Sequence, residues 1–112
     1  QGPEGPAGGA SYEFVVNYSG SSPTSVSSLP AGWSASISAN DVTITHTVGT
    51  MVNTVVYWGY SSALGIWRAR YPSASSELTT EESTKTIRFK IRISNTVVGT
   101  DSSGVARIVC LF

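Results

Sequence analysis

The stretch IRFKIRI, residues 87–93, alternates apolar and basic side chains without a break. Strict alternation is typical of a β-strand that has one face in a core and the other in water, because successive side chains point to opposite faces. We therefore predict that Ile87, Phe89, Ile91 and Ile93 fill the core, while the cations between them stay solvated. Such cations also protect a strand from pairing with another chain.

Further strands of this kind surround that stretch. Residues 12–18 alternate in the same way, and residues 33–48 form two alternating segments around a turn, which predicts a hairpin. Residues 19–32 and 72–82 are rich in turn-forming and polar residues and predict loops. Many short strands separated by turns predict one all-β domain in this chain of 112 residues. We expect an antiparallel β-sandwich of jelly-roll or immunoglobulin-like type.

Two segments, residues 53–60 and 104–112, are apolar on both faces of the predicted strand. A sandwich core covers only one face of a strand, so the second face needs another cover. We expect neighbouring copies of the chain to provide it. The residues assigned to this predicted trimer interface are Val56, Trp58, Ile108 and Phe112.

The first ten residues contain glycine at positions 2, 5 and 8, with Pro3 and Pro6 directly after two of these glycines. A collagen triple helix requires glycine at every third position, because no side chain fits at its crowded axis. One chain cannot form this structure, so the pattern predicts a homotrimer. We expect residues 1–10 to be a collagen-like stalk remnant and residues 11–112 to be a head domain. A flexible linker is the alternative interpretation of the glycines.

The chain has a formal net charge of zero, and charged residues make up only 12% of it. This fraction is low for a soluble monomer and supports a further face buried against a partner. All basic residues follow position 67, but the zero net charge and the lack of a recognition motif argue against nucleic-acid binding. No apolar run is long enough to span a bilayer, so we expect no membrane insertion.

Residues with catalytic chemistry are few and scattered. His46 is the single histidine and Cys110 the single cysteine, which supports neither a zinc site nor a Cys/His nucleophile. We expect His46 to be a structural imidazole in or near the core and Cys110 to be a small buried hydrophobe. Glu77, Glu81 and Glu82 lie in a predicted loop, where paired catalytic carboxylates have no rigid support. We therefore predict a protein that is not an enzyme and has no metal or cofactor.

Aromatic and arginine side chains gather between residues 60 and 71, a combination that suits sugar recognition and anchors many recognition surfaces. The predicted ligand-binding residues are Tyr60, Trp67, Arg68, Arg70 and Tyr71. In the alternative interpretation Trp67 and Tyr71 lie in the core. The arginines then pair with acids such as Glu81 or Glu82 at a subunit interface.

Residues 29–57, LPAGWSASISANDVTITHTVGTMVNTVVY, resemble the C-terminal domains of bacteriophage tail-fibre and related virion fibre proteins. The matching residues are Gly32, Trp33, Thr45, His46, Gly49, Thr50 and Tyr57, while Thr47 replaces the asparagine usual in the family. The resemblance implies a trimeric head on the virion that recognises a bacterial surface polysaccharide or another host receptor.

Two other functions remain compatible with these residues. One is a purely structural head that trimerises a collagen-like fibre or decorates a capsid. The other is a bacterial surface or eukaryotic secreted collagen-like protein, whose trimeric head resembles those of the complement and tumour necrosis factor families.

Overall fold

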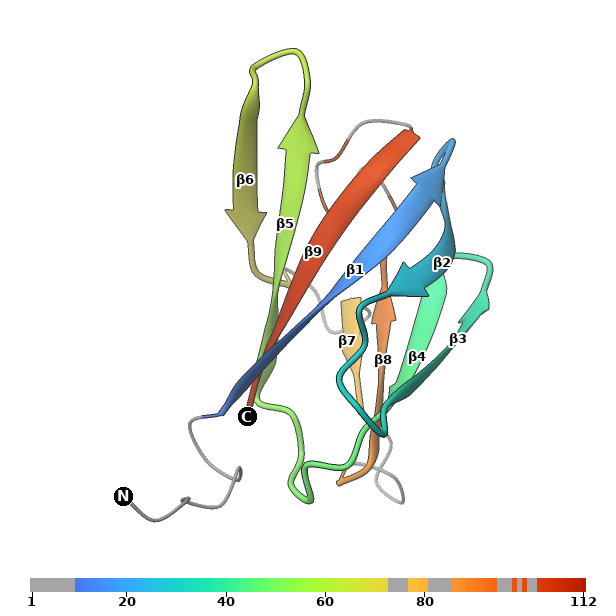
Figure 1. Ribbon diagram of the computed structural model, residues 1–112, viewed down its shortest axis with the longest axis vertical. Helices are drawn as coiled ribbons and strands as arrows, with labels where there is room; N and C mark the ends of the chain where they lie inside the picture. The colour runs from blue at the N-terminus through green and yellow to red at the C-terminus, as the bar shows by residue number, and fades with distance from the viewer. Residues whose placement is uncertain (1–9, 73–76, 81–85, 95–97, 99, 101–102) are drawn as a thin grey trace.

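The computed structural model describes residues 10–72, 77–80, 86–94, 98, 100 and 103–112, and nine β-strands lie in this part. The strands are β1 (Ser11–Ser19), β2 (Ser22–Ser27), β3 (Ser34–Ser38), β4 (Asp41–Thr45), β5 (Thr54–Ser61), β6 (Ile66–Arg70), β7 (Leu78–Thr79), β8 (Arg88–Arg92) and β9 (Ser103–Leu111). They form a five-stranded sheet in the order β2-β1-β9-β5-β6 and a four-stranded sheet in the order β3-β4-β8-β7 (Figure 1). All pairings are antiparallel, so the predicted all-β class with antiparallel sheets is confirmed.

The last strand, β9, is the centre of the five-stranded sheet. It pairs with β1 from Ser11 opposite Leu111 to Ser19 opposite Ser103, and it pairs with β5 on its other side. The backbone N–H of Phe112 donates to the carbonyl of Ala10 at 2.9 Å. The start of β1 and the end of the chain therefore lie together at one end of the molecule, and the β5–β6 hairpin projects at the opposite end (Figure 1).

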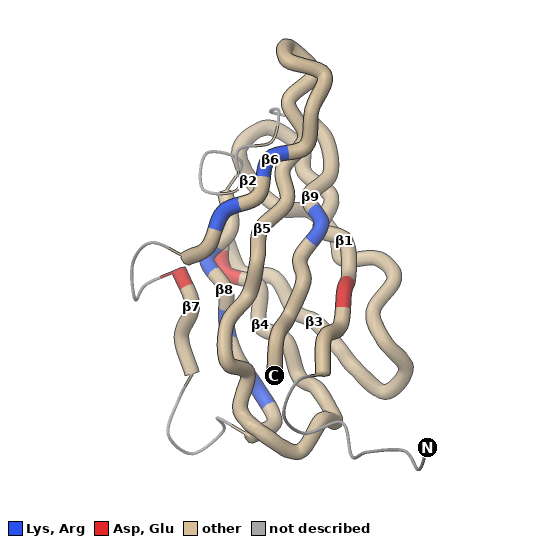
Figure 2. Tube along the Cα trace, turned by 90° about the vertical axis from the view of Figure 1, so that its left-hand side faces the viewer, with Lys and Arg blue, Asp and Glu red and all other residues tan. Residues whose placement is uncertain are grey.

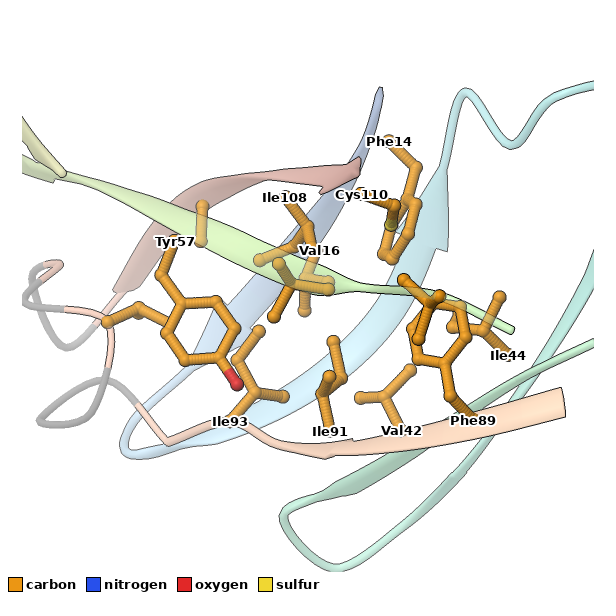
Figure 3. Close-up of a cluster of buried hydrophobic side chains, with 14 of the residues drawn as sticks. Phe14, Val16, Val42, Ile44, Tyr57, Phe89, Ile91, Ile93, Ile108 and Cys110 are labelled. Atoms are coloured by element: carbon orange, nitrogen blue, oxygen red, sulfur yellow. The ribbon is translucent and has the colours of Figure 1, made fainter. Parts of the chain in front are cut away.

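The core lies between the two sheets and is built from the inward-facing residues of both (Figure 3). Phe14, Tyr57 and Ile108 point inward from the five-stranded sheet, and Phe89 and Ile91 from the four-stranded one. All five are at most 1% exposed. Burial of each such side chain contributes about 1.5 to 3 kcal/mol, which makes this layer the main source of stability.

The stretch at 87–93 behaves as predicted at three of its four apolar positions. Phe89, Ile91 and Ile93 are buried, whereas the prediction for Ile87 is wrong, because that side chain is 46% exposed. The ladder between β4 and β8 begins only at Arg88, so Ile87 lies beyond the end of the sheet. It contributes its carbonyl instead, which accepts a hydrogen bond from the His46 N–H at 2.8 Å.

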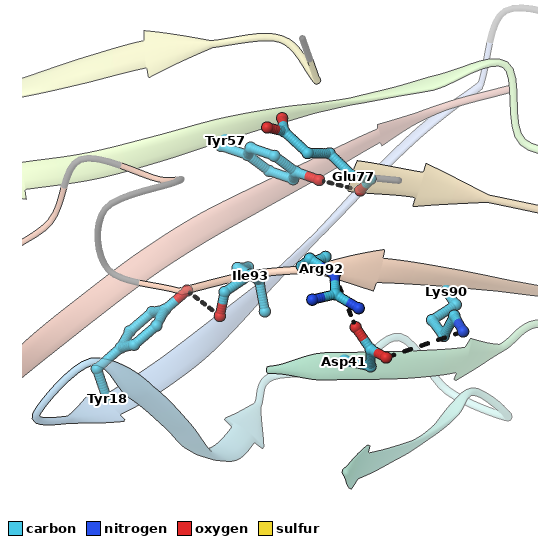
Figure 4. A network of polar contacts seen from close by, with 7 residues as sticks. All are labelled: Tyr18, Asp41, Tyr57, Glu77, Lys90, Arg92 and Ile93. Carbon is cyan, nitrogen blue, oxygen red and sulfur yellow. Dashed lines mark hydrogen bonds and ion pairs between the residues drawn. The ribbon is translucent and has the colours of Figure 1, made fainter. Parts of the chain in front are cut away.

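Polar contacts hold the four-stranded sheet on its outer side and link the two sheets within (Figure 4). On β4, the carboxylate of Asp41 lies 3.8 Å from Lys90 Nζ and 3.4 Å from Arg92 Nε. The hydroxyl of Tyr18 in β1 donates to the Ile93 carbonyl at 3.3 Å. Burial raises the pKa of Tyr18 far above its ordinary value, so this hydroxyl keeps its proton and remains a donor.

Two of the predicted loops contain short strands. Residues 19–32 include β2, which folds back on β1 after Gly20, a residue with a φ of +64°. Pro23 pairs with Tyr18 next to a bulge at Thr24 in β2, and an edge strand tolerates proline at a bulge. β7 lies within residues 72–82. Both are short strands at the edge of a sheet and are held by backbone pairing with one neighbour. Neither has the regular alternation of apolar and polar residues from which a strand can be predicted.

Candidate functional site

The outward side of the five-stranded sheet is largely apolar, and we call it the apolar outer face. The register places Val56 opposite Val109, Trp58 opposite Arg107, and Tyr60 opposite Trp67. Figure 2 shows β5 without a charged residue between β6 and β9. The members of this face are Val15, Val56, Trp58, Tyr60, Trp67, Val105, Arg107, Val109 and Leu111, all half-buried or exposed.

The outward side of the four-stranded sheet has the opposite character. Arg88, Lys90 and Arg92 alternate with the buried residues of β8, and serines and threonines occupy the outward positions of β3 and β4. A polar surface of this kind is satisfied by water. The two outer faces therefore differ sharply, and only the face of the five-stranded sheet suits contact with an apolar or aromatic-binding partner.

An aromatic pair lies where the apolar outer face meets the β5–β6 hairpin. The rings of Tyr60 and Trp67 have centroids 5.4 Å apart, and Arg107 Cζ lies 5.7 Å from the centroid of the Trp67 ring. Arg107 Nε also donates to Glu13 Oε2 at 2.6 Å, and this bond holds the pKa of Glu13 below its ordinary value. Glu13, Arg107 and Trp67 thus form a chain of contacts from β1 across β9 to β6. The chain orients an indole ring that is still 38% exposed.

The pleat of β6 divides the predicted ligand-binding residues. Tyr60 and Trp67 lie together on the apolar outer face, but Arg68 and Arg70 stand opposite Gly59 and Tyr57 and so point to the other side of the sheet. Tyr71 follows the end of β6 and is 63% exposed. The predicted set therefore does not form one site, and only its aromatic pair remains together.

The alternative interpretation of this stretch is wrong for Trp67 and Tyr71, because both are exposed rather than in the core. This interpretation also paired the arginines with acids at a subunit interface, and one such pair occurs within the chain. Arg70 Nη2 lies 3.6 Å from Glu77 Oε1. The acids named for this role, Glu81 and Glu82, lie outside the described residues.

The predicted interface residues are also divided. Val56 and Trp58 lie on the apolar outer face, but Ile108 is fully buried in the core and Phe112 is only 8% exposed. Phe112 packs against His46, with ring centroids 4.9 Å apart. The assignment of Ile108 and Phe112 to an outer face is corrected, because β9 is apolar on both sides and its alternation does not show which side meets the core.

Sequence reasoning missed Val109 and Leu111, which take the place of Ile108 and Phe112 on the apolar outer face. Arg107 on the same face was the one signal in the sequence, since charged residues are rarely buried, but a single charge on a strand that is apolar on both faces does not decide which face enters the core. It also missed the end of the β5–β6 hairpin. There Leu64 is 61% exposed and Ile66 is 48% exposed, around a tight turn at Gly65 with a φ of +69°.

His46 is a buried structural residue, as predicted. Its Nδ1 accepts a hydrogen bond from the Val48 N–H at 3.2 Å, and its ring lies 5.5 Å from that of Trp33 and 5.8 Å from that of Phe89. Burial lowers the pKa of His46, so the ring stays neutral at neutral pH. Cys110 is likewise buried, and burial raises the pKa of its thiol to about 12, which leaves no thiolate for nucleophilic chemistry.

The described residues contain no group of three or more histidines, cysteines, aspartates or glutamates that could hold a metal ion. In the same part of the chain, no helix has the length and apolar character needed to cross a membrane. Comparison of the chain with protein-family models, with curated proteins and with solved structures finds no match.

Proposed function

We propose that this chain is the head domain of a homotrimeric phage virion fibre with a collagen-like stalk, and that the head binds a glycan on the host cell surface. The partly exposed aromatic pair of Tyr60 and Trp67, with Arg107 over the Trp67 ring, is the observation that carries the proposal. The glycine period of residues 1–10 and the resemblance of residues 29–57 to fibre proteins support it.

The aromatic pair suits a sugar because a flat indole or phenol ring covers the apolar face of a pyranose. The Tyr60 hydroxyl and the Arg107 guanidinium can then donate hydrogen bonds to the ring hydroxyls. The contact of Arg107 with Glu13 keeps the guanidinium in place before the ligand arrives, which lowers the entropy lost on binding. This is binding chemistry, and the buried His46 and Cys110 take no part in it.

The placement of the aromatic pair along the molecule also supports a host-binding role. Ala10, where a stalk would join the head, lies beside Phe112 at one end, while Tyr60 and Trp67 flank the projecting hairpin at the other (Figure 1). A head carried on such a stalk presents its far end to the surroundings of the virion. The proposed sugar site therefore lies near the surface that meets a host cell first.

Under this proposal the sandwich is a jelly roll rather than an immunoglobulin-like domain. The first and last strands, β1 and β9, pair with each other, and β4 pairs with β8 in the second sheet. In a jelly roll, strands from the beginning of the chain pair with strands from its end, and each further pair lies inside the previous one along the sequence. The β1–β9 and β4–β8 pairs follow this order.

The test replaces Trp67 with Ala and measures adsorption of the purified protein to host bacteria and to a glycan array. We expect at least a tenfold loss of binding with the native mass retained, since aromatic anchors dominate recognition surfaces. Tyr71→Ala is the matched control, because Tyr71 is a more exposed ring on the same segment and lies outside the pair. We expect its binding to change less than twofold.

Equal losses at Trp67 and Tyr71 would contradict a site centred on the aromatic pair. If the unmodified protein binds no host cell and no glycan, the receptor-binding function is wrong. A trimer without any such binding would favour the structural alternative, a trimerisation or capsid decoration head. The largely apolar character of the outer face is the observation that favours this second candidate.

A further inference from the structure

The half of the apolar outer face nearest Ala10 and Phe112 consists of Val56, Val109 and Leu111, and we call it the stalk-proximal patch. We propose that this patch packs against the same patch of two further copies of the chain around the fibre axis. The inference rests on the proposed homotrimer and identifies the surface that forms it. None of the other described segments lies over this patch (Figures 1 and 2).

The place where the chain enters the head brings this patch close to the axis. Residue 10 joins the collagen-like stretch to β1, and three chains of a triple helix run together around one axis. Leu111 stands directly opposite Ser11, the first residue after that junction, and opposite Thr54 on its other side. Val109 and Val56 face each other two positions further from the junction. Among the outward side chains of β9, Leu111 and Val109 are therefore the first that neighbouring copies would meet.

The charges on the two outer faces distinguish which one can lie against copies of itself. The stalk-proximal patch carries no charge, and its neighbour Glu13 is already neutralised by Arg107 at 2.6 Å. The outer face of the four-stranded sheet carries Arg88, Lys90 and Arg92 against Asp41. Three copies of that surface would bring like charges together and repel one another. The distribution of charge therefore favours the outer face of the five-stranded sheet as the contact surface of the trimer.

This arrangement assigns different roles to the two halves of the apolar outer face. The half near the stalk joins the three copies. The half near the hairpin, with Tyr60 and Trp67, stays farther from the junction and remains open to a ligand. The division also accounts for an apolar surface that is longer than a sugar site needs.

The test replaces Val109 with Lys in the full chain and measures the mass by light scattering after size exclusion. In a single chain the new ammonium faces Glu13 across the strand pair, so we expect the fold to be retained. In the proposed trimer, three ammonium groups would be brought together in an apolar contact. We expect the mass to drop threefold, to the 11.8 kDa of one chain. Ser36→Lys, an exposed outward position on β3, is the matched control and should leave the trimer intact.

Val56→Lys repeats the test from the neighbouring strand. If both lysine variants remain trimeric, the stalk-proximal patch is not the interface, and the inference fails while the homotrimer and the receptor site stand. If the unmodified chain has the mass of one copy, the inference fails together with the homotrimer, and the Trp67 adsorption assay still decides receptor binding.

Should a lysine variant fail to fold, Val109→Thr decides the question, because threonine keeps the β-branched shape. The inference is supported if the Val109→Thr trimer dissociates at a protein concentration at least tenfold higher than that at which the unmodified trimer dissociates. An unchanged concentration dependence overturns it.

Discussion

Replacement of Ile91 with Ala should destabilise the domain strongly, whereas replacement of Ile87 with Ala should have a small effect. The two isoleucines lie in the same stretch, residues 87–93, four residues apart, and both were predicted to be core residues. The structure separates them, since Ile91 is fully buried and Ile87 is 46% exposed. The pair therefore tests the position of the sheet edge.

The magnitudes follow from burial. The change at Ile91 removes three carbon atoms from the core, and at roughly 0.8 kcal/mol for each carbon the lost transfer free energy is about 2.4 kcal/mol. The cavity left behind raises the expected cost to about 2 to 5 kcal/mol. At Ile87 folding buries about half of the side chain and no cavity forms, so the cost should be about 1 kcal/mol. Because urea m-values of small domains are about 1 to 3 kcal/mol/M, the Ile91 variant should unfold at a urea concentration at least about 0.7 M lower.

The assay is urea unfolding followed by tryptophan fluorescence, to which the three tryptophans contribute. Among them Trp33 is 8% exposed and packs against Tyr12, with ring centroids 5.1 Å apart, so its environment changes on unfolding. All proteins are compared at one concentration, since association would make the stability depend on concentration. Similar losses at both positions would show that Ile87 belongs to the core in solution. A loss below about 1 kcal/mol at Ile91 would contradict its complete burial.

Three further predictions use the same unfolding measurement. Lys90→Ala should change the free energy of unfolding by no more than about 0.5 kcal/mol, because exposed ion pairs contribute little, and a loss above about 1 kcal/mol would refute this. Tyr57→Phe should cost about 1 to 2 kcal/mol because it removes the buried hydroxyl that donates to the Glu77 carbonyl at 2.6 Å. Tyr71→Phe, at an exposed ring, should be neutral, so equal effects of the two changes would contradict the role of that bond. Finally, burial lowers the pKa of His46 below its ordinary value of 6.5, so the unfolded chain takes up this proton first as the pH falls. The stabilisation should be complete above about pH 6.5 and decrease below it, and His46→Gln should flatten this dependence between pH 7 and 5; an unchanged slope in the variant would assign it to other groups.

Local patterns predicted much of this fold. Alternation in residues 12–18, 33–48 and 87–93 identified β1, the β3–β4 hairpin and β8, because the two-residue period of a strand is written directly into its side chains. The burial of His46 and Cys110 was also predicted, since each shares a strand face with apolar neighbours. Of the candidate site, the sequence indicated the aromatic pair but did not separate it from Arg68 and Arg70.

The remaining features depend on contacts that no local pattern contains. Alternation shows which residues of β5 and β9 share a face, but both faces are apolar, and only the packing of the second sheet decides that Ile108 enters the core while Val109 stays outside. Ile87 lies outside the core because pairing with β4 begins one residue later, at Arg88. The central position of β9 depends on its pairing with β1, in which Ser11 faces Leu111 although the two residues are separated by nearly the whole sequence. By itself the sequence determined which side chains lie on a common face of each strand that it predicted, and in β8, where one face is basic, also which face is buried. For β5 and β9 the tertiary structure alone decided which face is covered, because burial results from the assembly of distant strands.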